Sequence, residues 1–140
     1  MDKEVLSIIL ILILVLLFAL MIYLNNSKKI DKSISKRILG DLTQVKKMVD
    51  TKNPLVYRDT IIRLDQLLSK SLQLHFRNTE SCGNNLKNAR DLFEKKAYNE
   101  IWEIHKLRNE IVHENQEVSS SQATRGYNIM SNAIKKLIYG

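Results

Sequence analysis

The sequence is poor in residues that interrupt helices and in residues that form cross-links or bind metals. Its 140 residues include one proline and four glycines. This composition excludes a collagen-like chain and disfavours long disordered segments or a β-sandwich with many turns. The single cysteine, Cys82, excludes an intramolecular disulfide and fits a reducing compartment. Cys82 and the histidines at positions 75, 105 and 113 lack zinc-ligand spacing, so we expect neither a metal nor another cofactor.

One long hydrophobic run is present near the N-terminus. Val5–Leu24 contains 20 residues, of which only Ser7 and Tyr23 are polar. At about 1.5 Å per residue, a helix of this length crosses the roughly 30 Å hydrocarbon layer of a bilayer. A cleaved signal peptide is the alternative, but residues 1–4 are not a basic leader and no small-residue cleavage pattern follows the run. The sequence therefore predicts a single-pass transmembrane helix over residues 5–24, with the lipid bilayer as a partner.

Positive charge is concentrated just after the hydrophobic run. The formal net charge is +7, and the N-terminal flank of the run carries only Lys3, beside Asp2 and Glu4. The C-terminal flank carries five basic residues, namely Lys28, Lys29, Lys32, Lys36 and Arg37. The positive-inside rule then predicts a short exterior tail (residues 1–4) and a cytoplasmic C-terminal part (residues 25–140) at the inner (plasma) membrane. These basic residues could also attract anionic headgroups, or they could only set the orientation.

The rest of the sequence follows helical periodicity, and no segment alternates convincingly with a period of two. Two apolar stripes recur at intervals of mostly three or four residues: Ile30, Ile34, Ile38, Leu42, Val45 and Val49, then Ile61, Leu64, Leu68 and Leu72. Between them, Asn53 is a predicted N-cap and Pro54 a predicted first helical residue. The predicted fold class is all-α, with a basic amphipathic connecting helix in residues 25–53 and a four-helix domain in residues 54–140.

Three further helices complete the predicted domain. Thr79 or Ser81 would cap the first of them, whose buried face would be Cys82, Leu86, Ala89 and Phe93. A short break around Lys95–Tyr98 would precede the next helix, which carries Ile101, either Ile104 or His105, Arg108 and Val112 on one side. Ser119 and Gln122 form a predicted capping box for the last helix, whose apolar positions are Ala123, Tyr127, Met130, Ile134 and Leu137.

The stretch from Trp102 to Glu114 contains the most informative motif. It follows the pattern Trp-x-x-His-x-x-Arg-Asn-x-x-x-His-Glu, with His105, Arg108, Asn109 and His113 at the polar positions. An arginine followed by a polar residue and then, five places on, by a histidine resembles the R-x4-6-H motif of HEPN domains. The stretch is also similar to small single-span bacterial membrane proteins of uncharacterised function. HEPN domains are small helical bundles, so the resemblance implies that fold for residues 54–140.

The resemblance also implies a homodimer and a chemistry. Many HEPN domains are ribonucleases that act as dimers and use no metal. Carried over by motif, Arg108 would stabilise the phosphate in the transition state, His113 would act as general acid or base, and Asn109 would orient the site. His105 would lie nearby, and the RNA 2′-hydroxyl would be the nucleophile. We further expect the last helix and the Trp102 helix to offer surplus apolar surface for the dimer contact.

Each of these residues also has a structural interpretation. Arg108 and His113 lie about 140° apart around an ideal helix, so they converge only if the helix loosens near His113 or a partner subunit supplies one of them. His113 could simply complement the helix dipole, and His105 could be a hydrogen-bonded packing residue. Arg108 could pair with a nearby glutamate: Glu103, Glu110 or Glu114. The acidic residues around the motif would repel RNA.

Two functions therefore remain open from the sequence. The first is a membrane-anchored cytoplasmic HEPN-like domain that serves as a non-catalytic dimerisation or interaction module. The second is a metal-independent ribonuclease, of the toxin or RNA-processing type, that uses Arg108 and His113 and takes RNA as its partner.

Overall fold

The computed structural model describes residues 2–26 and 30–140, and regular structure within these ranges is helical throughout. The longer helices are α1 (Lys3–Asn26), α2 (Lys32–Asp50), α3 (Tyr57–Phe76), α5 (Lys95–Glu114) and α6 (Ser120–Tyr139). The shorter elements are the α-helix α4 (Cys82–Asn88) and the 3₁₀ turns η1 (Pro54–Val56) and η2 (Arg90–Leu92). The all-α prediction is confirmed.

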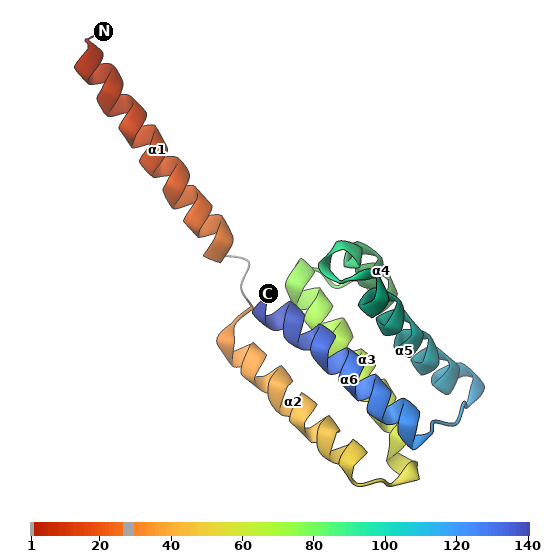
Figure 1. The fold of residues 1–140 in the computed structure, drawn as a ribbon. Coiled ribbons are helices and arrows are strands. Elements are labelled where there is room, and N and C mark those ends of the chain that lie inside the picture. Colours follow the sequence, from red (N-terminus) through yellow and green to blue (C-terminus); the bar gives the residue numbers. More distant parts are fainter. Residues whose placement is uncertain (1, 27–29) are drawn as a thin grey trace.

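Helix α1 buries none of its apolar side chains. Lys3–Leu24 is long and apolar enough to cross a membrane, and all of its side chains are exposed to the surroundings. Figure 1 shows α1 extending away from the other helices. A fully exposed apolar helix is unfavourable in water and suits lipid. A helix long and apolar enough to cross a membrane is thus present where one was predicted, whereas the membrane anchoring itself and its orientation stay predictions.

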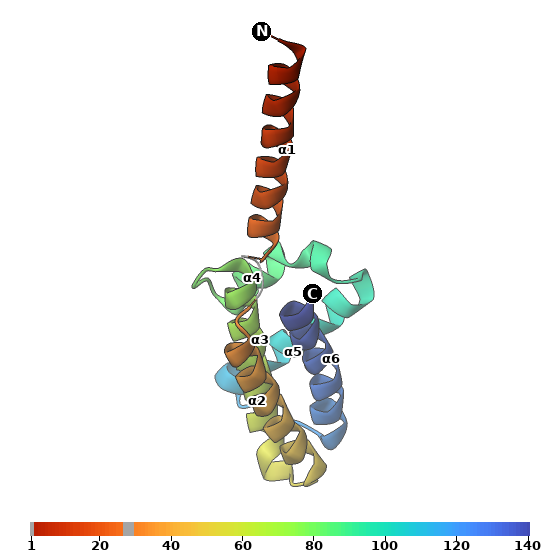
Figure 2. The same ribbon diagram turned by 90° about the vertical axis from the view of Figure 1, so that its left-hand side faces the viewer.

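The core of the domain is formed around α3 and α6. These helices lie side by side, with α2 on one side and α5 on the other (Figure 1). The predicted α3 stripe of Ile61, Leu64, Leu68 and Leu72 is fully buried. The connecting helix α2 joins the same core through Ile38, Leu42 and Val45. Short α4 lies at the end of the bundle where α2 begins and α6 ends (Figures 1 and 2).

The sequence predicted most helix starts correctly because capping is local. Asn53 accepts a hydrogen bond from the Leu55 amide, and Pro54 opens the 3₁₀ turn that leads into α3. Ser81, rather than Thr79, caps α4 by accepting from the Asn84 amide. At α6, the Ser119 side chain accepts from the Gln122 amide while the Gln122 side chain accepts from the Ser119 amide. The predicted capping box is confirmed.

The boundary between the second and third helices of the domain, α4 and α5, was predicted wrongly. Helix α4 ends at Asn88, the chain turns through η2, and Phe93 is extended, with φ −123° and ψ 149°. Helix α5 then begins at Lys95, where the sequence had suggested a break. Lys95–Tyr98 contains no helix-breaking residue, and the turn at residues 89–94 buries both Ala89 and Phe93 without placing them on one helix.

Most of the apolar surface that α5 and α6 were expected to offer a partner is buried within the chain. The apolar positions Ala123, Met130, Ile134 and Leu137 of α6 are all buried within the chain. Outside α1, the large apolar side chains exposed in the described residues are Leu55, Val112 and Tyr139. The stripe that suggested a dimer contact is the inner face of α6.

Candidate functional site

A polar groove of about 550 Å³ lies where α3, α4 and α5 meet. Its walls include Asp65 and Lys70 from α3, Cys82 from the start of α4, and His105 and Arg108 from α5. Three helices thus bring a carboxylate, a thiol, an imidazole and two cations to one place. We call this feature the polar groove.

Asp65 and His105 form the buried centre of the polar groove. Asp65 Oδ1 lies 2.7 Å from His105 Nδ1, and their side chains are 5 % and 12 % exposed. An ionised carboxylate can only accept, so Nδ1 carries the hydrogen and donates it. The His105 ring also lies edge-on to Trp102, with 5.6 Å between ring centroids. The interpretation of His105 as a hydrogen-bonded packing residue therefore fits its surroundings.

Arg108 joins the same carboxylate from the open side of the groove. Its Nε lies 3.6 Å from Asp65 Oδ2, and its Nη1 donates to Asn109 Oδ1 at 3.0 Å. The carboxylate beside Arg108 is thus that of Asp65, which is 43 positions away, rather than that of Glu103, Glu110 or Glu114. The Arg108 side chain remains 31 % exposed, and its buried Nε has no hydrogen-bond partner among the described residues. Part of the guanidinium can therefore still meet a ligand.

Cys82 completes the cluster as a neutral thiol. Its Sγ lies 3.8 Å from Asp65 Oδ1 and can donate a weak hydrogen bond to it. Burial, together with the negative charge of Asp65, raises the pKa of Cys82 well above its ordinary value. The thiol therefore stays protonated near neutral pH and is a poor nucleophile.

Asp65, Cys82 and His105 are also the residues that could hold a metal ion. One ligand atom from each lies within 4.8 Å of the others. An oxygen, a sulfur and a nitrogen donor would suit zinc better than magnesium or calcium. However, a metal would require the thiolate, and Asp65 already serves His105 and Arg108. The arrangement therefore fits a hydrogen-bonded network better than a metal centre.

The structure brings together some of the residues predicted for the site and separates others. His105, Arg108 and Asn109 all line the polar groove. His113 is exposed and does not line it, and α5 remains helical through Glu114, so the helix does not loosen at His113. Of the basic residues after α1, Lys32, Lys36 and Arg37 are exposed on α2, while Lys28 and Lys29 lie outside the described residues.

Asp65, the residue that connects the others, was not predicted from the sequence. A signal for it was available, because Asp65 lies within the apolar stripe of α3, four residues after Ile61 and three before Leu68. A carboxylate at a core position is costly unless it is paired, so it indicates a polar partner from another helix. The sequence did not reveal which helix supplies that partner.

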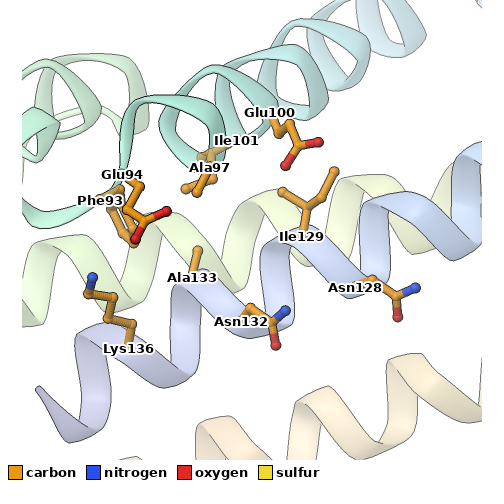
Figure 3. Close-up of a pocket in the computed structure, with 10 residues that line it drawn as sticks. All are labelled: Phe93, Glu94, Ala97, Glu100, Ile101, Asn128, Ile129, Asn132, Ala133 and Lys136. Atoms are coloured by element: carbon orange, nitrogen blue, oxygen red, sulfur yellow. The ribbon is translucent and has the colours of Figure 1, made fainter.

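A second groove, of about 310 Å³, lies between α5 and α6. Its side chains are shown in Figure 3, where Ala97 and Ile101 of α5 lie opposite Ile129 and Ala133 of α6. Glu94 and Lys136 stand near one end. We call it the α5–α6 groove. It lacks a buried polar cluster, so the polar groove remains the candidate for ligand chemistry and the α5–α6 groove a candidate for contact with a partner.

In comparisons with known proteins, no family model matches the sequence, and no curated protein or solved structure is significantly similar to it. The molecule is thus described as an all-helical domain with one N-terminal helix apolar enough to cross a membrane. The likeness to HEPN domains stays a prediction from the motif.

Proposed function

We propose that the chain is a membrane-anchored, cytoplasmic, HEPN-like interaction module that associates as a homodimer and is not catalytic as a single chain. The surroundings of Arg108 carry this proposal. Its guanidinium is engaged by Asp65 and Asn109, whereas His113 is exposed and lies outside the polar groove. A ribonuclease of the kind implied by the motif needs the arginine and the histidine at one phosphate. Within one chain these two groups do not meet.

The α5–α6 groove supports association of two copies. Its floor is apolar, and its rim carries a carboxylate at Glu94 and an ammonium at Lys136 (Figure 3). In a two-fold symmetric contact, each copy offers the same patch to the other, so opposite charges on one patch can face each other across the axis. The groove therefore suits a second copy of the same chain better than a strongly charged polymer such as RNA.

A cross-linking experiment tests this proposal. Asn132 is exposed beside the α5–α6 groove, and the native Cys82 is buried, so Asn132→Cys introduces one accessible thiol. Full-length Asn132→Cys in membranes should give a covalent dimer with a short bismaleimide. Asp41→Cys, at an exposed position on α2, is the matched control and should not. Equal cross-linking of both variants, or of neither, would contradict the proposed contact.

Ribonuclease activity is the second candidate, and the partly exposed guanidinium of Arg108 favours it. Lys70 lines the same groove, so two cations could meet a phosphate there, and a second copy could supply His113. The full-length protein in micelles, incubated with RNA and a chelator, tests this. The protein is a ribonuclease, and the proposal of a non-catalytic module is wrong, if RNA is cleaved and both Arg108→Lys and His113→Ala lower the cleavage rate about 100-fold or more. Arg108→Lys is informative because it retains the charge but loses the fork.

A further inference from the structure

A third groove, of about 590 Å³, lies at the end of the domain that follows α1. It is lined by the first half of α2, by the end of α3 and by the last turn of α6, through residues that include Lys32, Lys36, Leu39, Leu137, Ile138 and Tyr139. Figures 1 and 2 show the beginning of α2 and the end of α6 at the same end of the bundle. We call this feature the basal groove.

The covalent chain keeps the basal groove near the bilayer surface. The candidate membrane span ends at Leu24, helix α1 ends at Asn26, and α2 begins at Lys32. Six Cα-to-Cα steps of at most about 3.6 Å separate Asn26 from Lys32, so the two are no more than about 22 Å apart. The headgroup regions extend the roughly 30 Å hydrocarbon layer to about 40–45 Å in total. If α1 spans the membrane, as the proposed function holds, the groove is therefore within reach of the headgroups.

The rim of the basal groove carries two lysines that are free to bind an anion. Lys32 and Lys36 are one helical turn apart on α2, so they share a face, and both are exposed. Within the described residues, neither ammonium has a carboxylate within 4.0 Å. By contrast, Lys46 at the other end of α2 pairs with Asp50 at 3.0 Å. Asp31 stands beside the rim, but it caps α2 by accepting from the Ser33 amide.

Most of the remaining lining is apolar, with Ser35 and His75 as its other polar side chains. Leu39 and Ile138 are partly buried against the core and present their remaining surface to the groove, and Tyr139 at its edge is 71 % exposed. Aromatic side chains of this kind are favoured at the level of the headgroups. An apolar floor below two ammonium groups matches a molecule that joins a negative phosphate to hydrocarbon.

We propose that the basal groove binds an anionic phospholipid, with its phosphate at Lys32 and Lys36 and its glycerol and first methylenes against Leu39 and Ile138. The domain would then lie on the membrane surface instead of moving freely below α1. A free phosphate would leave the apolar floor uncovered. A nucleic acid would need a longer basic track and several exposed rings for stacking, whereas the described lining offers two lysines and one strongly exposed ring, that of Tyr139.

Hydrogen exchange of the full-length protein in nanodiscs tests the proposal. Nanodiscs of phosphatidylcholine alone are compared with nanodiscs that also contain phosphatidylglycerol, and both faces are accessible, so the orientation of α1 does not matter. Peptides covering residues 30–39 and 135–140 should be protected in the anionic discs only. Lys32→Gln with Lys36→Gln should lose this protection, since each lysine near an anionic surface contributes about fivefold in affinity.

Three comparisons separate the possible outcomes. The double variant Lys46→Gln with Lys47→Gln removes the same charge from the far end of α2 and should leave the protection intact. If both double variants lose protection equally, the effect comes from general surface charge, and a specific site in the groove is overturned. Tyr139→Ser should weaken the protection, because it removes apolar contact without changing charge. Protection by inorganic phosphate in phosphatidylcholine discs would overturn the lipid assignment.

The result also distinguishes this proposal from the membrane anchor on which it rests. Protein that enters the nanodiscs but shows the same exchange in both lipid compositions would overturn the groove and leave the anchor standing. Protein that is not retained by nanodiscs of either composition would overturn the anchor and the groove together.

Discussion

Asp65 is the residue on which the polar groove depends. Its buried carboxylate lies in an apolar helix face, where an unpaired charge would be strongly unfavourable. His105, Arg108 and Cys82 compensate it from two other helices. The same contacts hold His105 in one tautomer and restrain Arg108. A residue outside the sequence motif therefore determines how the motif residues are presented.

We predict that Asp65→Ala destabilises the domain, because it leaves His105 Nδ1 without its acceptor and removes the carboxylate that faces Arg108 Nε. Loss of a hydrogen-bonding partner at a buried site costs about 1–3 kcal/mol. The matched control is Asp59→Ala on the same helix, which removes an exposed pair with Arg63 and should cost less than about 1 kcal/mol. The free energy of unfolding in urea measures both. Equal values for the two variants would show that the polar network contributes no more than a surface ion pair.

The motif residues could be predicted from the sequence because they lie on one helix. His105, Arg108 and Asn109 are separated by three positions and one, so any helix through them brings them to neighbouring directions. Asp65 is 40 positions from His105, and helical periodicity contains no information on how α3 packs against α5. The angle between Arg108 and His113 also followed from helix geometry. Whether a second copy supplies His113 remains a prediction about assembly.

The helices could be predicted where neighbouring residues in the sequence determine them. The caps at Asn53, Ser81 and Ser119 and the apolar stripe of α3 follow from residue types at fixed spacing. The break after α4 was misplaced because burial of Ala89 and Phe93, which depends on the other helices, decides where the chain turns. The role of the α6 stripe was misjudged for the same reason. Its residues had to be apolar, but only the packing of α3 shows that they face inward.

Two glycines, Gly126 in α6 and Gly40 in α2, differ in the space around them and give opposite predictions for stability. A Cβ added to Gly126 in α6 would lie 2.6 Å from Ile61 Cδ1, in a fully buried part of the core. Gly126→Val should therefore destabilise the domain by about 1–3 kcal/mol through overpacking. Gly40, inside α2, has nothing within 4 Å of an added Cβ, so Gly40→Ala should stabilise by about 0.5–1 kcal/mol through helix propensity. Thermal unfolding followed by circular dichroism measures both, and a Gly126→Val variant as stable as the parent would contradict the tight α3–α6 contact.

The molecule as a whole combines an anchor, a charged juxtamembrane region and a packed domain. Helix α1 is apolar on all sides, whereas the large apolar residues of the other helices are mostly buried within the chain. The three grooves lie on different sets of helices. A contact with lipid at the basal groove and with a second copy at the α5–α6 groove would therefore leave the polar groove open. The two contacts could orient that groove at the membrane surface.

The orientation of the molecule is the last prediction. Because basic residues are concentrated after α1, a fluorescent reporter fused after Gly140 should be cytoplasmic, and an alkaline phosphatase fused at the same place should be inactive. Neutral replacements of Lys28, Lys29, Lys32, Lys36 and Arg37 should give mixed orientations. Replacing five distant lysines (Lys95, Lys96, Lys106, Lys135 and Lys136) should have no effect, because the rule counts charges within about 15–20 residues of the span. An active phosphatase fusion of the parent would place the domain outside, where a cytoplasmic RNA or protein partner could not reach the polar groove.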